Sequence, residues 1–89
     1  MSTPDESIVI TNIPRAVRAW AADRKIWFVL EDGREIGFPA ERFPRLRGAP
    51  DDLLAQVRIE ARGRALRWEE LDEDISIAGI LAGHFGPGS

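Results

Sequence analysis

The sequence contains no cysteine and one histidine, His84. Without cysteine the chain has no disulfide framework, no thiolate nucleophile and no cysteine-based zinc site, so packing alone must stabilise it. A single histidine leaves one candidate for a catalytic triad or a histidine-rich metal site. It follows Gly83 near the end of the sequence, where a helix C-terminus favours a cation, and we interpret it as structural. The lack of thiols is typical of a reducing compartment, and we expect a cytoplasmic protein.

Long apolar runs are missing as well. No stretch approaches the roughly 18 apolar residues that are needed to cross a bilayer. The N-terminus carries acids where a signal peptide needs a basic segment. We therefore expect no membrane association.

Signatures of catalysis are also absent from the sequence. Ser76 is the only serine in the part expected to fold, and it lies outside any G-x-S-x-G motif. The glycines are scattered at turns rather than gathered in a phosphate-binding loop. We therefore predict no enzymatic activity, no bound cofactor and no metal site.

What is present indicates one small domain. A length of 89 residues, with 44% hydrophobic and 30% charged residues, is typical of a globular protein with a thin core. We expect a single α+β domain over residues 15–84, between a flexible N-terminal tail or lead-in at residues 1–14 and a flexible C-terminal tail at residues 85–89. The net charge of −3 argues against nonspecific nucleic-acid binding, which depends on Lys and Arg neutralising phosphates.

The clearest local pattern is a β-hairpin in KIWFVLEDGREIGF, residues 25–38. A two-residue loop at Asp32-Gly33 is one interpretation. A three-residue loop, with Gly33 in the left-handed conformation, instead places four apolar side chains on one face: Ile26, Phe28, Ile36 and Phe38. We predict the three-residue loop for this reason, with Trp27 and Val29 on the other face.

The remaining elements are expected to be short, because Pro39, Pro44 and Pro50 exclude a long helix between them. Before the hairpin we predict a strand at residues 16–23 that turns at Asp23-Arg24. After it we predict a helical turn at residues 41–46 with Phe43 and Leu46 in the core, and a helix from Pro50 at its first position to Gln56. The chain then continues with a strand at residues 57–62 that has Val57, Ile59 and Ala61 on one face, a strand at residues 65–68, and a helix at residues 77–83. The expected fold is a small twisted antiparallel sheet with two or three short helices.

Five carboxylates are crowded before the last helix, at Glu69, Glu70, Asp72, Glu73 and Asp74. They lack the alternating oxygens and central glycine of an EF-hand calcium loop. We interpret the segment as a solvated turn that Leu71 and Ile75 anchor to the core, with Asp74 or Ser76 capping the helix. A partner-binding acidic edge is the alternative.

Arginines occur in two groups, Arg42, Arg45 and Arg47 on the expected turn and Arg58, Arg62 and Arg64 along and after a strand. Folding brings several of them to one surface if these elements adjoin, and Arg is suited to bidentate pairing with carboxylate or phosphate. The alternative is a solvated face balanced by nearby acids. Trp20, Trp27 and Trp68 are interpreted as core or edge residues, with a stacking platform for single-stranded nucleic acid as the alternative.

Two segments of the chain resemble a known family. LEDGREIGFPAERFPRL and RWEELDEDISIAGILAG are similar to the bacterial family named domain of unknown function 2442 (DUF2442). The matching residues are Asp32, Gly33, Arg34, the FPRL of residues 43–46, Trp68, Glu70, Leu71, Asp72, Glu73, Asp74, Ser76 and Gly79. The departures are Glu69, where the family usually has proline, and Ala78, where an acid is common.

The resemblance, over roughly residues 16–83, implies a small α+β domain with no established catalytic residues. Family members are often encoded beside another short protein, in an arrangement that resembles toxin–antitoxin pairs. Some members carry an added helix-turn-helix domain, and DNA binding of that kind is not expected of this chain alone.

We therefore expect a non-enzymatic protein-interaction module, an antitoxin-like member of a two-protein bacterial operon that binds a small co-operonic protein. The alternative is weak nucleic-acid binding through an Arg-bearing face. The sequence leaves open whether the sheet face with Trp27 and Val29 pairs with a second copy as a homodimer. The residues predicted to bind the partner are Arg42, Arg45, Arg47, Arg58, Arg62, Glu70, Asp72 and Glu73.

Overall fold

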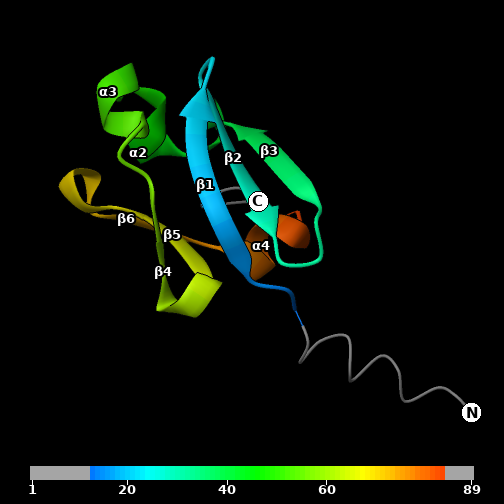
Figure 1. The fold of residues 1–89 in the computed structure, drawn as a ribbon. Helices are drawn as coiled ribbons and strands as arrows, with labels where there is room; N and C mark the ends of the chain where they lie inside the picture. Colours follow the sequence, from blue (N-terminus) through cyan, green and yellow to red (C-terminus); the bar gives the residue numbers. More distant parts are fainter. Residues whose placement is uncertain (1–12, 84–89) are drawn as a thin grey trace, which may run out of the picture.

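The structure is a computed structural model, and it describes residues 13–83 (Figure 1). One antiparallel sheet has the order β1-β2-β3 and is formed by β1 (Ala16–Ala22), β2 (Lys25–Leu30) and β3 (Glu35–Pro39). A second has the order β4-β5-β6 and is formed by β4 (Arg58–Glu60), β5 (Ala65–Trp68) and β6 (Glu73–Ser76). The predicted antiparallel α+β fold is confirmed, with its strands divided between two small sheets.

Short helices connect and cover these sheets. Within the described range the α-helices are α2 (Pro44–Arg47), α3 (Asp51–Leu54) and α4 (Ile77–Leu81). The 3₁₀ turns are η1 (Ala40–Arg42), η2 (Ala61–Gly63) and η3 (Glu69–Leu71). No helix among these residues is long and apolar enough to span a membrane. The tails predicted at residues 1–14 and 85–89 lie outside the described range, apart from residues 13 and 14, and so does the role predicted for His84.

The β2–β3 hairpin has the predicted three-residue loop. Ile26 pairs with Phe38 and Phe28 pairs with Ile36. The loop closes with the Leu30 N–H donating to the Arg34 carbonyl at 2.8 Å. Gly33 has a φ of 95°, a left-handed conformation that a residue without Cβ adopts at no steric cost.

The β1–β2 turn at Asp23-Arg24 is also confirmed. Both residues have positive φ, 55° and 64°, which matches the two-residue turn that suits twisted strands. Residues other than glycine adopt this backbone conformation at a cost in free energy. Here the Arg24 guanidinium offsets it by donating to the Ala49 carbonyl at 2.7 Å and the Arg47 carbonyl at 2.9 Å. The turn is thereby fastened to the segment between α2 and α3.

The core lies between the sheets and the helices. Its largest fully buried side chains come from both sheets and from α2, α3 and α4: Trp68, Phe28, Phe38, Ile26, Leu30, Leu46, Leu54, Leu66 and Ile77. Phe43 and Leu46 are buried as predicted, and the rings of Phe38 and Phe43 meet edge to face at 5.3 Å. The Trp68 indole donates to the Leu54 carbonyl at 3.1 Å, so its polar atom is satisfied inside the core.

The acidic segment differs from the prediction because part of it is a strand. Residues 73–76 form β6, in which Ile75 pairs with Leu66 and is buried. Only one apolar side chain faces inward, so the period-two pattern is hidden among acids. Asp72, with a φ of 50°, connects η3 to this strand.

Ser76, and not Asp74, caps the last helix. The Ser76 hydroxyl accepts a hydrogen bond from the Gly79 N–H at 2.7 Å. Asp74 lies within β6 and faces Arg67 on β5. The helix ends at Leu81, two residues before the predicted end at Gly83, whose φ is 86°.

The middle of the chain contains shorter elements than predicted. The turn at residues 41–46 is divided between η1 and α2, and α3 ends at Leu54 with Pro50 as its N-cap rather than its first residue. The strand predicted at residues 57–62 is reduced to β4, because the chain turns at residues 61 and 62, whose φ values are 53° and 58°. This turn places Gly63 against β1. The two sheets adjoin where β1 lies beside β4 (Figure 1).

Candidate functional site

One candidate site is a group of charged side chains from the second sheet, from η3 with the residue that follows it, and from α2. We define the charged cluster as Arg45, Arg58, Arg67, Glu60, Glu69, Asp72, Glu73 and Asp74, which ion pairs connect. The register of the sheet aligns Arg58 with Arg67 and Arg67 with Asp74. Because directly paired residues share a face, strand pairing alone brings these three side chains together.

Arg67 is the centre of the charged cluster. Its guanidinium contacts three carboxylates, Asp74 at 2.8 Å, Glu69 at 3.0 Å and Asp72 at 3.2 Å. These hydrogen bonds raise the pKa of Arg67 above its ordinary value, and the bond to Glu69 has the largest effect. Charge-assisted bonds to one planar guanidinium hold the three carboxylates in fixed positions.

Arg45 joins α2 to the same cluster. Its guanidinium donates to the Asp72 carbonyl at 2.6 Å, and it lies 3.8 Å from the Asp72 carboxylate and 3.9 Å from that of Glu73. Burial raises the pKa of Glu73, while the charge of Arg45 opposes this effect and the nearby acids reinforce it. The backbone between η3 and β6 is therefore attached to a helix that is distant in sequence.

Four of the predicted partner-binding residues meet in the charged cluster: Arg45, Arg58, Asp72 and Glu73. The other four lie outside this ion-paired group, on neighbouring segments of the chain: Arg42 in η1, Arg47 in α2, Arg62 in η2 and Glu70 in η3. The four other members of the cluster, Glu60, Arg67, Glu69 and Asp74, lie outside that predicted set. The alternation along β4 and β5 is the signal that could have identified Arg67.

The cluster neutralises much of its own charge. Its arginines bind its carboxylates, and each carboxylate oxygen that accepts from a guanidinium is less available to a ligand. Among the described residues no group of metal-ligating side chains has the arrangement of a metal site. The pairing of opposite charges within the charged cluster favours a structural role for the cluster over a catalytic one.

A second candidate site is the outer face of the first sheet. Trp20 on β1 pairs with Trp27 on β2, and Trp27 pairs with Gly37 on β3. The next row along the strands consists of Arg18, Val29 and Glu35. We call these six residues the tryptophan face.

The tryptophan face is left uncovered by the core. Trp20, Trp27 and Val29 are partly exposed, and they are absent from both the buried core and the partly buried side chains packed against it. The Trp27 ring lies over Gly37, because a Cβ built there would be 2.5 Å from ring carbons. The Arg18 guanidinium lies 5.2 Å from the centre of the Trp20 ring, within the range of a cation–π contact.

The three tryptophans do not form one stacking platform. Trp68 is only 1% exposed and belongs to the core, whereas Trp20 and Trp27 share the tryptophan face. The prediction that Trp27 and Val29 point away from the inner apolar face is confirmed by the register.

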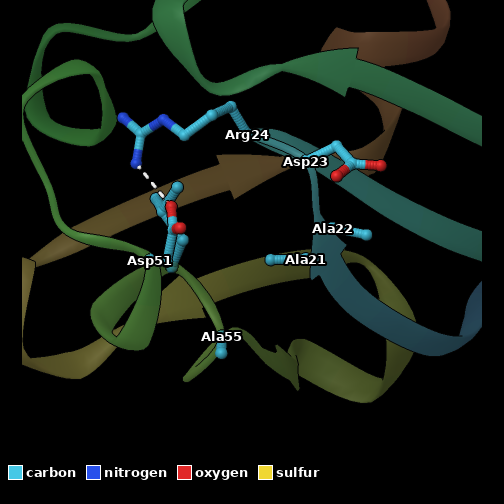
Figure 2. A pocket seen from close by; sticks show the side chains of 7 residues that line it. Ala21, Ala22, Asp23, Arg24, Asp51 and Ala55 are labelled. Carbon is cyan, nitrogen blue, oxygen red and sulfur yellow. Dashed lines mark hydrogen bonds and ion pairs between the residues drawn. The ribbon is translucent and has the colours of Figure 1, made fainter.

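A shallow cleft of about 270 Å³ lies between the β1–β2 turn and α3, and Figure 2 shows its lining. Its walls include alanines at positions 21, 22 and 55 together with Leu54. Its charged pair, Arg24 and Asp51, is already joined at 3.1 Å. With its guanidinium also bound to main-chain carbonyls, Arg24 supports the fold at this position.

Comparisons with known proteins agree with this architecture. A protein of unknown function from Rhodospirillum rubrum, seen in a crystal structure, superposes with a TM-score of 0.82 at 39% identity, over 86% of this chain and 95% of its own. An uncharacterized protein from Chromobacterium violaceum, solved by solution NMR, has the same fold with a TM-score of 0.77 at 23% identity, over 96% of this chain and 80% of its own. No curated protein matches the sequence.

The family assignment comes from the sequence itself. The family described as protein of unknown function (DUF2442) matches residues 16–86, which include every strand of both sheets. The resemblance seen in the hairpin turn and in the Trp68–Gly79 segment therefore extends through the whole described fold. The chain belongs to the DUF2442 family.

Proposed function

We propose that the protein is a non-enzymatic protein-interaction module whose contact surface is the tryptophan face. The observation that carries this proposal is that Trp20 and Trp27 lie side by side on a sheet face that the core does not use. Tryptophan and arginine are enriched where proteins bind proteins, because they supply large contact areas together with polar groups. Arg18 above Trp20 adds that combination here.

The family resemblance favours a specific form of this function. It supports an antitoxin-like member of a two-protein operon, which binds a small protein encoded beside it. The residues predicted from the sequence to bind such a partner, Arg42, Arg45, Arg47, Arg58, Arg62, Glu70, Asp72 and Glu73, stay the proposed contact with it. Since the cluster's charges are already paired, we expect them to contribute selectivity and association rate more than affinity.

Nucleic-acid binding is supported less by the geometry. The guanidinium groups of Arg45, Arg58 and Arg67 each lie within 4 Å of carboxylates, and phosphates would have to displace these acids. The tryptophan face carries one arginine and one glutamate, so it offers no continuous basic path for a phosphate backbone.

The proposal is tested by capture from the lysate of the host, with and without nuclease. Tagged wild-type protein is expected to recover a protein partner in both conditions, and Trp20→Ala is expected to lose it. Val17→Ala is the matched control, because Val17 is an apolar residue of the same strand that is 54% exposed and lies at the β1 irregularity. Equal recovery by Trp20→Ala, or recovery that nuclease abolishes, would contradict the proposal.

A further inference from the structure

We infer that the tryptophan face binds the same face of a second copy, around a two-fold axis parallel to β2. This inference rests on the proposed function, since it names the partner of that surface. It is carried by the positions of two opposite charges, Arg18 on β1 and Glu35 on β3, in one row of the sheet.

The symmetry determines which residues meet. The axis is parallel to the central strand β2 and lies between the first sheets of the two copies. It places β1 of one copy opposite β3 of the other and preserves each row. Arg18 of each copy then faces Glu35 of the other, giving two identical ion pairs. A two-fold interface is self-complementary in this way, with each contact made twice.

The same two charges cannot readily pair within one chain. They are separated by β2, and neighbouring strands lie about 4.8 Å apart, so their backbones are roughly 10 Å apart. Within residues 13–83 neither side chain has an ion pair, and Arg18 lies over Trp20 instead. Within one chain both side chains project in the same direction, on either side of Val29. Across the interface they project toward each other from packed sheets about 10 Å apart, a gap that arginine and glutamate together can span.

The second row brings aromatic rings of the two copies together. Trp20 of one copy faces Gly37 of the other, and Gly37 is the position of this row that has no side chain. Trp27 leans over Gly37 within each chain, so the incoming Trp20 ring meets an aromatic ring. Aromatic contacts of this kind favour offset or edge-to-face packing.

A two-fold axis perpendicular to the strands fits less well. It would exchange the rows, so Arg18 would face Ala22 and Glu35 would face Pro39 of the other copy. Both charges would then be covered without a partner, which is costly. The parallel axis places the outward residues of β2, Lys25, Trp27 and Val29, opposite their own copies. Lys25 is the charged one of the three, and it lies at the exposed edge beside the tryptophan face, where solvent screens like charges.

Sedimentation of the full chain over a range of concentrations tests this arrangement. The wild type is expected to dimerise, and R18E and E35R are each expected to dimerise at least about tenfold more weakly, because like charges then face each other twice. An equimolar mixture of the two variants, and the double variant R18E/E35R, restore both ion pairs and are expected to dimerise again. R64E, which makes the same charge change at an exposed arginine in the turn between η2 and β5, should dimerise as the wild type does.

The outcomes separate this inference from the proposed function. Dimerisation of R18E and E35R at wild-type strength, or failure of the mixture to restore it, would overturn the inference, once circular dichroism shows that each variant is folded. A monomeric wild type would also overturn it. In that case capture of another protein that depends on Trp20 would still support the proposed function, and loss of that capture would remove both.

Discussion

Gly63 of η2 lies directly against Ala16 of β1, at the junction of the two sheets. A Cβ at position 63 would be 2.8 Å from the Ala16 carbonyl oxygen and 2.7 Å from the Cβ of Arg15. Gly63 also has a φ of 88°, in the left-handed region. Only glycine allows the backbone both this conformation and this close approach.

Gly63→Ala is therefore expected to destabilise the protein by about 2–4 kcal/mol, through left-handed strain and overpacking against a backbone that cannot move aside. Denaturant unfolding measures the loss. Gly48→Ala is the control, because Gly48 has a φ of −94° and nothing lies within 4 Å of its Cβ position. Equal stability of the two variants would mean that the junction can adjust.

The cap of α4 makes a second prediction. Ser76→Ala removes the acceptor of the Gly79 N–H and is expected to cost about 1 kcal/mol, as other N-cap deletions do. Ser76→Asp should retain most of the stability, because a carboxylate oxygen also accepts at this position. Thermal unfolding compares the two variants, and a Ser76→Ala protein as stable as the wild type would refute the cap's contribution.

Trp68 is predicted to stabilise the core through a polar atom as well as through its volume. Trp68→Phe removes the indole donor from the Leu54 carbonyl, which keeps only the longer bond from the Val57 N–H at 3.3 Å. It also creates a small cavity, and together these losses are expected to cost about 1–3 kcal/mol. Trp27→Phe, on the tryptophan face, should change the free energy of unfolding of the monomer by no more than about 0.5 kcal/mol. Chemical denaturation at protein concentrations too low for dimerisation compares the two variants. Equal losses of unfolding free energy would contradict the different roles assigned to the two tryptophans.

The raised pKa of Glu73 predicts that the stability of the protein depends on pH. This pKa is raised in the folded protein, chiefly by burial, so the native state binds a proton more readily than the unfolded state. The contribution of Glu73 to stability is then fully present below the ordinary glutamate pKa of about 4.3 and is lost as pH rises through the raised value.

Glu73→Gln removes this titration. The variant should be more stable than the wild type at pH 7, and the difference should shrink as pH falls toward the ordinary glutamate pKa. Unfolding free energies measured across this pH range test the sign. A variant less stable than the wild type at neutral pH would show that attraction to Arg45 outweighs burial.

The first sheet was predictable because local sequence patterns indicate both which side chains face the core and where the strands turn. Alternating apolar residues and Gly33 determine the hairpin register, and the same alternation assigns Trp27 to the outer face. The strand β6 was not predictable from local pattern, since acids surround its one buried apolar residue, Ile75. That strand depends on pairing with Leu66, a contact that only the tertiary fold supplies.

The charged cluster illustrates the same difference. In the sequence the arginines at positions 42–64 precede the acidic segment, and the sequence left open whether nearby acids balance the arginines or both groups bind a partner. Strand register and the position of α2 bring Arg45, Arg58 and Arg67 onto those acids. Distances between elements that are far apart in sequence cannot be obtained from composition.

The acidic segment has a further consequence for how copies of the chain can associate. It contains β6, an edge strand of the second sheet, and a free edge is a template on which strands of other molecules aggregate. Glu73 and Asp74 on this strand, with Asp72 before it, would repel the same edge of another copy. These carboxylates can thus protect the chain from uncontrolled growth of intermolecular sheets.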